Sequence, residues 1–189
     1  MSFHPAVRIA SVACVLACGP TAPEPSAPTA VTQWPQVSAA DAYFPLIEGN
    51  LYHYVTDENG EPGMLVANVR RLDATHGSLR IGASEKRFVY DAKGVAYEGG
   101  AYVLQLPLAV GTRWPGEHGG ETSIRATGIT LGVPAGKYAE CIETFEVANE
   151  IRYVNTYCPD VGLARIDVTS ARGEAHIILQ RYGAPVKID

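Results

Sequence analysis

The chain has 189 residues, of which 47% are hydrophobic and 19% are charged, and its formal net charge is −5. This balance is typical of a folded protein and argues against an intrinsically disordered chain. The basic residues are scattered, so the acidic chain lacks the positive patch on which nucleic-acid-binding proteins depend. We therefore expect no nucleic-acid partner.

The first 18 residues have the order of a bacterial export signal. Arg8 is the only charged residue that precedes Cys18, and residues 9–17 are all small or apolar. This stretch has the length of the apolar part of a signal peptide and is too short to cross a bilayer. The segment ends in Val15-Leu16-Ala17-Cys18, which resembles the lipobox of bacterial lipoproteins: an aliphatic residue, a spacer, a small residue and cysteine.

The lipobox resemblance implies that residues 1–17 are removed as a signal peptide and that the thiol of Cys18 carries a lipid. Two alternatives stay open. Cys14 is a second candidate for the lipid, although Ser11 fits the position three residues before it less well. A plain secretory signal cut near Ala17 would leave no lipid at all.

Residues 18–41 are predicted to form a lipid-anchored tether. Five prolines stand among Ala, Thr and Ser, a composition that cannot bury a core and favours an extended polyproline II conformation. At ~3.1 Å per residue, about 20 such residues would hold a domain up to ~60 Å from the membrane. We expect the lipid to bind a membrane of the cell envelope. The outer membrane is favoured, with the domain facing the periplasm or the cell surface, because Gly19 is not the aspartate that some bacteria use as an inner-membrane retention signal.

Residues 42–189 are predicted to form a single, mainly β domain. Short alternating or apolar runs of strand length are separated by turn residues at close spacing. This pattern indicates an all-β, antiparallel fold of nine or ten strands, in a curved sheet or a partly closed β-barrel. The nine clearest runs are 51–56, 64–72, 79–82, 87–90, 95–97, 101–106, 122–131, 162–169 and 174–182, and residues 138–158 are considered separately below.

One sequence pattern occurs twice in this domain. Residues 44–52 and 106–114 both read apolar-Pro-Leu-x-x-Gly-x-x-aromatic. Proline ends one element, and glycine turns the chain into a strand whose aromatic residue can pack inward. Two copies indicate a recurrent corner rather than a repeat array.

Two further segments, Val133-Pro-Ala-Gly136 and the stretch 157–163 (Tyr-Cys-Pro-Asp-Val-Gly-Leu), complete a succession of motifs. Together with the corner, they resemble uncharacterised secreted lipoproteins of bacteria over about residues 43–165. The resemblance implies a curved antiparallel sheet, distantly like the half-barrels of envelope lipoprotein carriers. Its motifs are turns, and they indicate no residue of the domain that would bind a lipid ligand.

Cys141 and Cys158 are the remaining cysteines, and export would permit their oxidation. If 138–147 and 151–158 form a hairpin that turns at residues 149–150, opposed residue numbers add to 299. Cys141 and Cys158 then face each other at disulfide distance. Two alternatives stay open: a helix over 138–148, whose apolar residues also fit a helical stripe, and two free buried thiols.

We predict no catalytic residues, no metal and no cofactor. The four histidines of the domain lie at no metal-ligand spacing, and the alternating Asp57, Asn59 and Glu61 suit a hairpin loop better than a calcium site. Glu117 and His118, in a glycine-rich loop, come nearest to an acid/base pair. A hydrolase would need further groups convergent on a histidine. The histidines are His53, His76, His118 and His176.

These features predict a non-enzymatic envelope lipoprotein that acts as a structural scaffold through contacts with envelope proteins. The alternative is a binding module or carrier that holds an apolar ligand in the concave face of the sheet. The ten tyrosines of the chain would either line such a hollow or fill it, and filling is the default. A connected apolar cavity of at least ~300 Å³ would favour the carrier.

Overall fold

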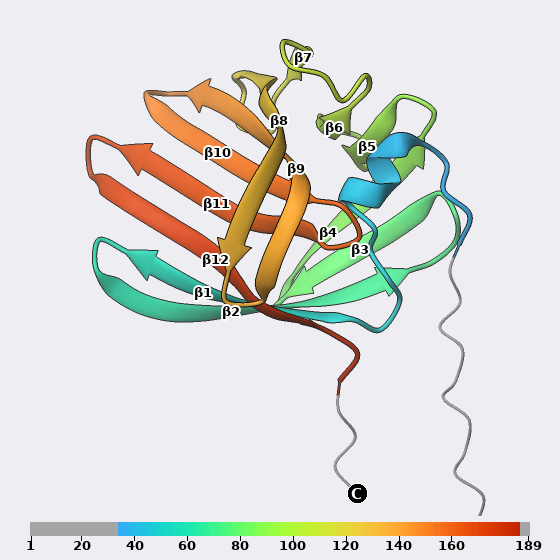
Figure 1. The fold of residues 1–189 in the computed structure, drawn as a ribbon, viewed down its shortest axis with the longest axis horizontal. Coiled ribbons are helices and arrows are strands. Elements are labelled where there is room, and N and C mark those ends of the chain that lie inside the picture. Colours follow the sequence, from blue (N-terminus) through green and yellow to red (C-terminus); the bar gives the residue numbers. More distant parts are fainter. Residues whose placement is uncertain (1–33, 186–189) are drawn as a thin grey trace, which may run out of the picture. The chain divides into compact units, whose positions relative to one another are not determined.

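The computed structural model describes residues 34–185, which form one twelve-stranded antiparallel sheet after a short 3-10 helix, η1 (Ala39–Tyr43) (Figure 1). Cys18, Cys14 and most of the tether lie outside the described residues. The strands are β1 (Leu51–Glu58), β2 (Glu61–Arg71), β3 (His76–Ile81), β4 (Ser84–Asp91), β5 (Gly94–Tyr97), β6 (Tyr102–Gln105), β7 (Arg113–Pro115), β8 (Glu121–Val133), β9 (Gly136–Ala148), β10 (Ile151–Cys158), β11 (Gly162–Ser170) and β12 (Gly173–Gly183).

The sheet curves into a partly closed barrel (Figure 1). The strand order is β6-β5-β4-β3-β2-β1-β12-β11-β10-β9-β8-β7, so every strand pairs with its neighbours in the chain, except that β1 also pairs with β12 and β6 does not pair with β7. The two edges of the sheet are therefore β6 and β7. The predicted all-β, curved or partly closed sheet is confirmed.

The number of strands is higher than the nine or ten that the sequence predicts. The strand missed outright is β7, because its three residues are too few to show alternation and the last of them, Pro115, is a poor signal for a strand. The register predicted for β9 and β10 is confirmed: Ile151 pairs with Ala148, and the ladder continues to Tyr157 opposite Ile142. The helix alternative over 138–148 is wrong, because from residue 142 onward burial alternates with the period of a strand.

The two corners share the same glycine turn, although the Leu106-Pro107 peptide bond of the second is cis. Gly49 and Gly111 both have positive φ, +79° and +91°. Each occupies the third position of a tight turn, which requires positive φ. Their N–H groups donate to Val69 O (3.3 Å) and Ile124 O (2.9 Å), one strand further along the chain. The aromatic residue three positions after each glycine is buried. Each corner thus starts a strand and sets its register against the next one.

The β8–β9 hairpin bends over the sheet. Its pairing shifts three times between Ile124 and Leu131, and Gly128 and Glu140 have positive φ at the bend. Beyond the bend, residues 129–139 form an arm that crosses in front of β10, β11 and β12 (Figure 1). Ala135 N donates to Leu179 O of β12 across 3.2 Å, which fixes the tip of the arm.

Side chains fill the inside of the sheet. Tyr52, Tyr54 and Tyr90 are buried, and their hydroxyl groups donate to the carbonyl oxygens of Val161 (2.9 Å), Leu163 (2.9 Å) and Phe44 (2.7 Å). Burial raises the pKa of all three phenols. The tyrosines therefore fill the interior, as small barrels generally require, with their polar ends satisfied.

The folded part begins earlier than residue 42. Ala40 and Asp41 are buried, and the carboxylate of Asp41 accepts hydrogen bonds from Val37 N (2.7 Å) and Ser38 Oγ (3.0 Å). These bonds gather residues 37–41 into a turn that leads into η1. The tether assigned to 18–41 therefore overlaps the domain, because the small residues of this segment have the composition of a linker although they are packed.

Candidate functional site

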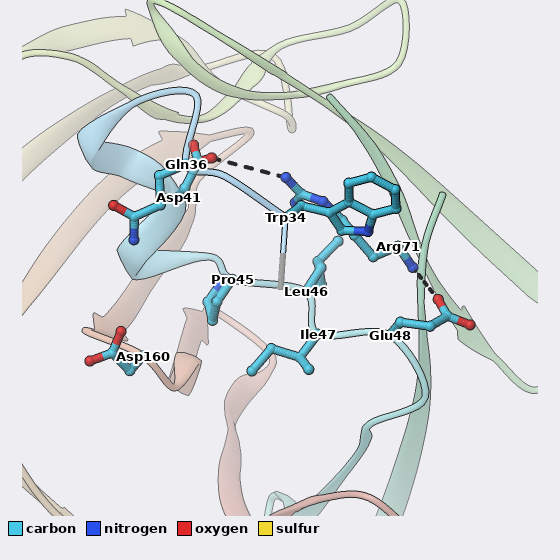
Figure 2. A pocket seen from close by; sticks show the side chains of 9 residues that line it. All are labelled: Trp34, Gln36, Asp41, Pro45, Leu46, Ile47, Glu48, Arg71 and Asp160. Atoms are coloured by element: carbon cyan, nitrogen blue, oxygen red, sulfur yellow. Dashed lines mark hydrogen bonds and ion pairs between the residues drawn. The ribbon is translucent and has the colours of Figure 1, made fainter. Parts of the chain in front are cut away.

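A cavity of about 410 Å³ opens beside η1 (Figure 2). Its walls come from three parts of the chain: the segment that contains η1 and the first corner, the end of β2, and the turn between β10 and β11. The lining residues are Trp34, Gln36, Asp41, Pro45, Leu46, Ile47, Glu48, Arg71 and Asp160.

The floor of the cavity is a fixed, buried charge pair. Arg71 Nη2 lies 4.0 Å from Asp41 Oδ2, and both side chains are 5% exposed. The guanidinium carbon lies 3.5 Å from the centre of the Tyr90 ring, while Nε and Nη2 donate to Asp73 O (2.8 Å) and Ala74 O (2.5 Å). Asp41 balances the charge of the arginine, and the hydrogen bonds hold the plane of the guanidinium in place.

The rim of the cavity is acidic. Glu48 and Asp160 are exposed, and in Figure 2 they lie on either side of an apolar strip formed by residues 45–47. Glu48 Oε2 accepts a hydrogen bond from the backbone N–H of Arg71 at 2.5 Å. Neither carboxylate forms a salt bridge with any residue in the described part of the chain. The rim therefore carries two charges that no nearby cation balances.

The remaining wall is apolar. Leu46 is 3% exposed and anchors the strip in the core, whereas Trp34 leaves 40% of its surface exposed. The nine lining residues include no His, Cys, Ser, Thr or Tyr, so the charged groups of the cavity are three carboxylates and one guanidinium, and none has an ordinary pKa near neutrality. These groups and the apolar wall suit the binding of a cation on an apolar stem.

The sequence did not predict this cavity. The corner pattern located residues 45–49, but nothing in the spacing relates Asp41, Arg71 and Asp160, which converge only through the fold. One feature of the sequence could have indicated a buried charge pair here. Arg71 lies on the buried face at the end of β2, and a buried arginine requires a partner.

Two solved structures are similar to this chain. A candidate exported protein with a YmcC-like fold from Bacteroides fragilis NCTC 9343 matches with a TM-score of 0.45 at 13% identity, over 75% of this chain and 98% of that protein. A candidate lipoprotein from Parabacteroides distasonis ATCC 8503 matches with a TM-score of 0.42 at 10% identity, over the same shares. No protein-family model matches the chain, and no curated protein matches it.

Glu117 and His118 are not hydrogen-bonded to each other in the structure. The partner of His118 is the buried Glu146 on β9, which accepts from His118 N and Nδ1 (both 3.0 Å), Gly120 N (3.0 Å) and Thr122 Oγ1 (3.2 Å). Among the described residues, no serine, threonine or cysteine is hydrogen-bonded to His118. Glu146 therefore organises the β7–β8 loop.

Glu117 contacts the opposite edge of the sheet. Its carboxylate accepts hydrogen bonds from Lys86 Nζ (2.5 Å) and from the hydroxyl of Tyr97. Burial raises the pKa of Glu117, but these two hydrogen bonds, together with the charges of Lys86 and His118, outweigh burial and hold the pKa below its ordinary value. The β7–β8 loop is thereby connected to β4 and β5.

The other histidines lie apart from one another. His76 Nδ1 contacts Asp73 (3.1 Å), and His176 Nδ1 contacts Asp167 (2.6 Å), whereas His53 lies within β1. Over residues 34–185, no three or more side chains of His, Cys, Asp or Glu come together in a way that could hold a metal ion. The carboxylate of Asp57 accepts from Gly60 N at 2.8 Å, the contact of a hairpin turn.

Cys141 and Cys158 are joined by a disulfide in the structure, with 2.00 Å between the sulfur atoms and 4.2 Å between the Cα atoms. Both are fully buried. Cys141 follows Glu140, one of the residues at the bend of the β8–β9 hairpin, so the bond ties the base of the arm to the end of β10.

Across residues 34–185, the structure contains no helix with the length and apolar character needed to cross a membrane.

Proposed function

We propose that this chain is a lipid-anchored protein of the bacterial cell envelope, and that its folded domain works as a scaffold through contacts with other envelope proteins. The lipobox-like segment that ends at Cys18 and the proline-rich stretch after it support the anchor. Several acyl chains, at ~0.8 kcal/mol per buried CH₂, would make such attachment effectively permanent. The residue after the anchor, Gly19, favours the outer membrane.

The filled interior of the sheet favours a scaffold over a carrier. The hollow on the concave face, between Phe44, Tyr52, Tyr54 and Leu163, measures about 10 Å³. That volume is at the lower limit for one water molecule, and an apolar ligand of ordinary size needs at least ~300 Å³. Two larger cavities, of about 410 Å³ beside η1 and about 340 Å³ along β2, β3 and β4, are both lined by charged side chains, which suits an apolar ligand poorly. This filling is the observation that carries the proposal.

Two measurements test the proposal. Native lipid extraction of the purified mature protein should release no apolar molecule in stoichiometric amount, because the anchor is covalently bound to Cys18 and stays with the protein; a co-purifying apolar ligand would establish the carrier instead. Fractionation of cells should place the protein in the membrane fraction, and Cys18→Ser should release it. Cys14→Ser is the matched control and should leave the protein in the membrane. Release by Cys14→Ser but not by Cys18→Ser would move the anchor to Cys14.

A further inference from the structure

We propose that the acidic cavity beside η1 is a docking site for a basic segment of a partner protein, in which Lys or Arg stands next to an apolar residue. This inference rests on the proposed scaffold function, because it names the surface through which the scaffold makes contact. Three observations support the docking site: the shape of the cavity, the fixed charges of its floor and the unbalanced charges of its rim.

The cavity is formed before any partner arrives. Arg71 is held between Asp41, the Tyr90 ring and two backbone carbonyls, so the floor has no freedom to collapse into the space above it. The volume of about 410 Å³ is large enough for one long side chain together with part of its neighbour. A preformed pocket that accepts one anchoring side chain is typical of the energetic centre of a protein interface.

The charges select a cation. Three carboxylates and one guanidinium line the cavity, and the guanidinium already lies beside Asp41. The charges of Glu48 and Asp160 therefore remain to attract a positive group and to repel an anion. Since both residues are exposed, the attraction to each is modest and is screened by salt.

The apolar surface selects the stem that carries the cation. The apolar strip (residues 45–47) runs between the two rim carboxylates, and Trp34 presents an exposed ring beside it (Figure 2). Lys and Arg bury their methylene stems on such surfaces while their charged ends reach a carboxylate or an aromatic face.

A protein segment fits this arrangement better than a free amine. Glu48 and Asp160 lie on opposite sides of the strip, so one small cation contacts one of them. A segment with cations on both sides of an apolar residue engages both carboxylates and the strip together. We therefore expect each rim carboxylate to contribute to binding, and the apolar residue to contribute as well.

The test uses acetyl-Arg-Leu-Arg-amide as the probe and the mature full chain, purified in a non-ionic detergent. Binding is followed by NMR titration, and the change in tryptophan fluorescence that is lost in Trp34→Phe gives a second signal. We expect saturable binding that weakens as salt is added. Glu48→Gln and Asp160→Asn should each weaken binding about threefold, and the double variant about tenfold, as the loss of exposed ion pairs implies.

The matched control removes two exposed carboxylates on either side of the β1–β2 turn, Glu58→Gln together with Glu61→Gln, which changes the net charge equally. It should leave the affinity unchanged. Three results would overturn the proposal: no saturable binding, equal binding of acetyl-Glu-Leu-Glu-amide, or equal loss of affinity in the control. Binding of acetyl-arginine-amide as tight as that of the tripeptide would assign the site to a small cation instead. The titration can be performed whether or not Cys18 carries a lipid, so failure here is distinct from failure of the anchor.

Discussion

The indole Nε1 of Trp114 donates a hydrogen bond to the backbone carbonyl of Tyr102 across 2.8 Å, and this bond joins the two edges of the sheet. Trp114 lies on β7 and Tyr102 on β6, the two strands that do not pair with each other. Glu117 adds contacts to Lys86 and Tyr97 from the same side. Side chains thus close the barrel where the backbone ladder is absent.

Replacement of Trp114 by Phe should destabilise the fold. The indole is 2% exposed, and its loss leaves the Tyr102 carbonyl without this donor, which costs about 1–3 kcal/mol. Urea unfolding followed by circular dichroism measures the change. Trp34→Phe is the matched control, because Trp34 is 40% exposed, and it should stay within about 0.5 kcal/mol of the parent. Equal stability of the two variants would contradict the bridging role.

Replacement of Glu146 by Gln should loosen the β7–β8 loop. The buried carboxylate accepts four hydrogen bonds, two on each oxygen. The amide of Gln keeps one acceptor for the N–H groups of His118 and Gly120, but it places an NH2 group where Oε2 accepts from His118 Nδ1 and Thr122 Oγ1. We expect a loss of about 2 kcal/mol, as for hydrogen bonds to a buried charge. Amide hydrogen exchange of His118 and Gly120 should accelerate. Glu121→Gln, at a carboxylate that is 60% exposed, is the control and should change neither quantity.

The turn at Asp73 should add an acid-sensitive contribution to stability. Side-chain and backbone hydrogen bonds from Thr75 hold the pKa of Asp73 at about 2, below its ordinary value of 3.8. Because the folded pKa is depressed, this contribution is complete above about pH 4 and is lost as the pH falls toward 2. NMR titration should show the Asp73 pKa rising in Thr75→Val. An unchanged value in that variant would assign the depression to another group.

The disulfide should be detectable in solution. Denaturation without a reductant should expose no thiol from Cys141 or Cys158, and two reactive thiols would contradict the bond. The two cysteines are 17 residues apart, and a loop of this size adds ~3 kcal/mol to stability through the unfolded state. The double variant Cys141→Ala with Cys158→Ala should lose about that amount, which urea unfolding measures.

Local features of the sequence were sufficient for the fold class and for part of the register. Alternating runs fix which residues face inward, and the turn at Asn149-Glu150 sets the pairing of β9 with β10 by simple counting. The repeated Pro-Leu-x-x-Gly pattern located both corners. Each of these inferences depends on residues within a few positions of one another.

Features made by distant residues could not be predicted in this way. The cavity needs Asp41, Arg71 and Asp160, which belong to separate elements and meet only after the sheet has closed. The bridge between Trp114 and Tyr102 depends on the two edges being adjacent. The packed segment 37–41 was missed for another reason, since a turn held by one aspartate has the same composition as a linker.

Mass spectrometry of the mature amino-terminal peptide decides whether the protein has a lipid anchor. We expect a mature chain that begins at Cys18 and carries a diacylglyceryl group on its thiol. The peptide mass should therefore exceed that of the unmodified sequence by the mass of the lipid. A mature chain that begins at or near residue 18 with an unmodified thiol would rule out the anchor and establish a plain secreted protein.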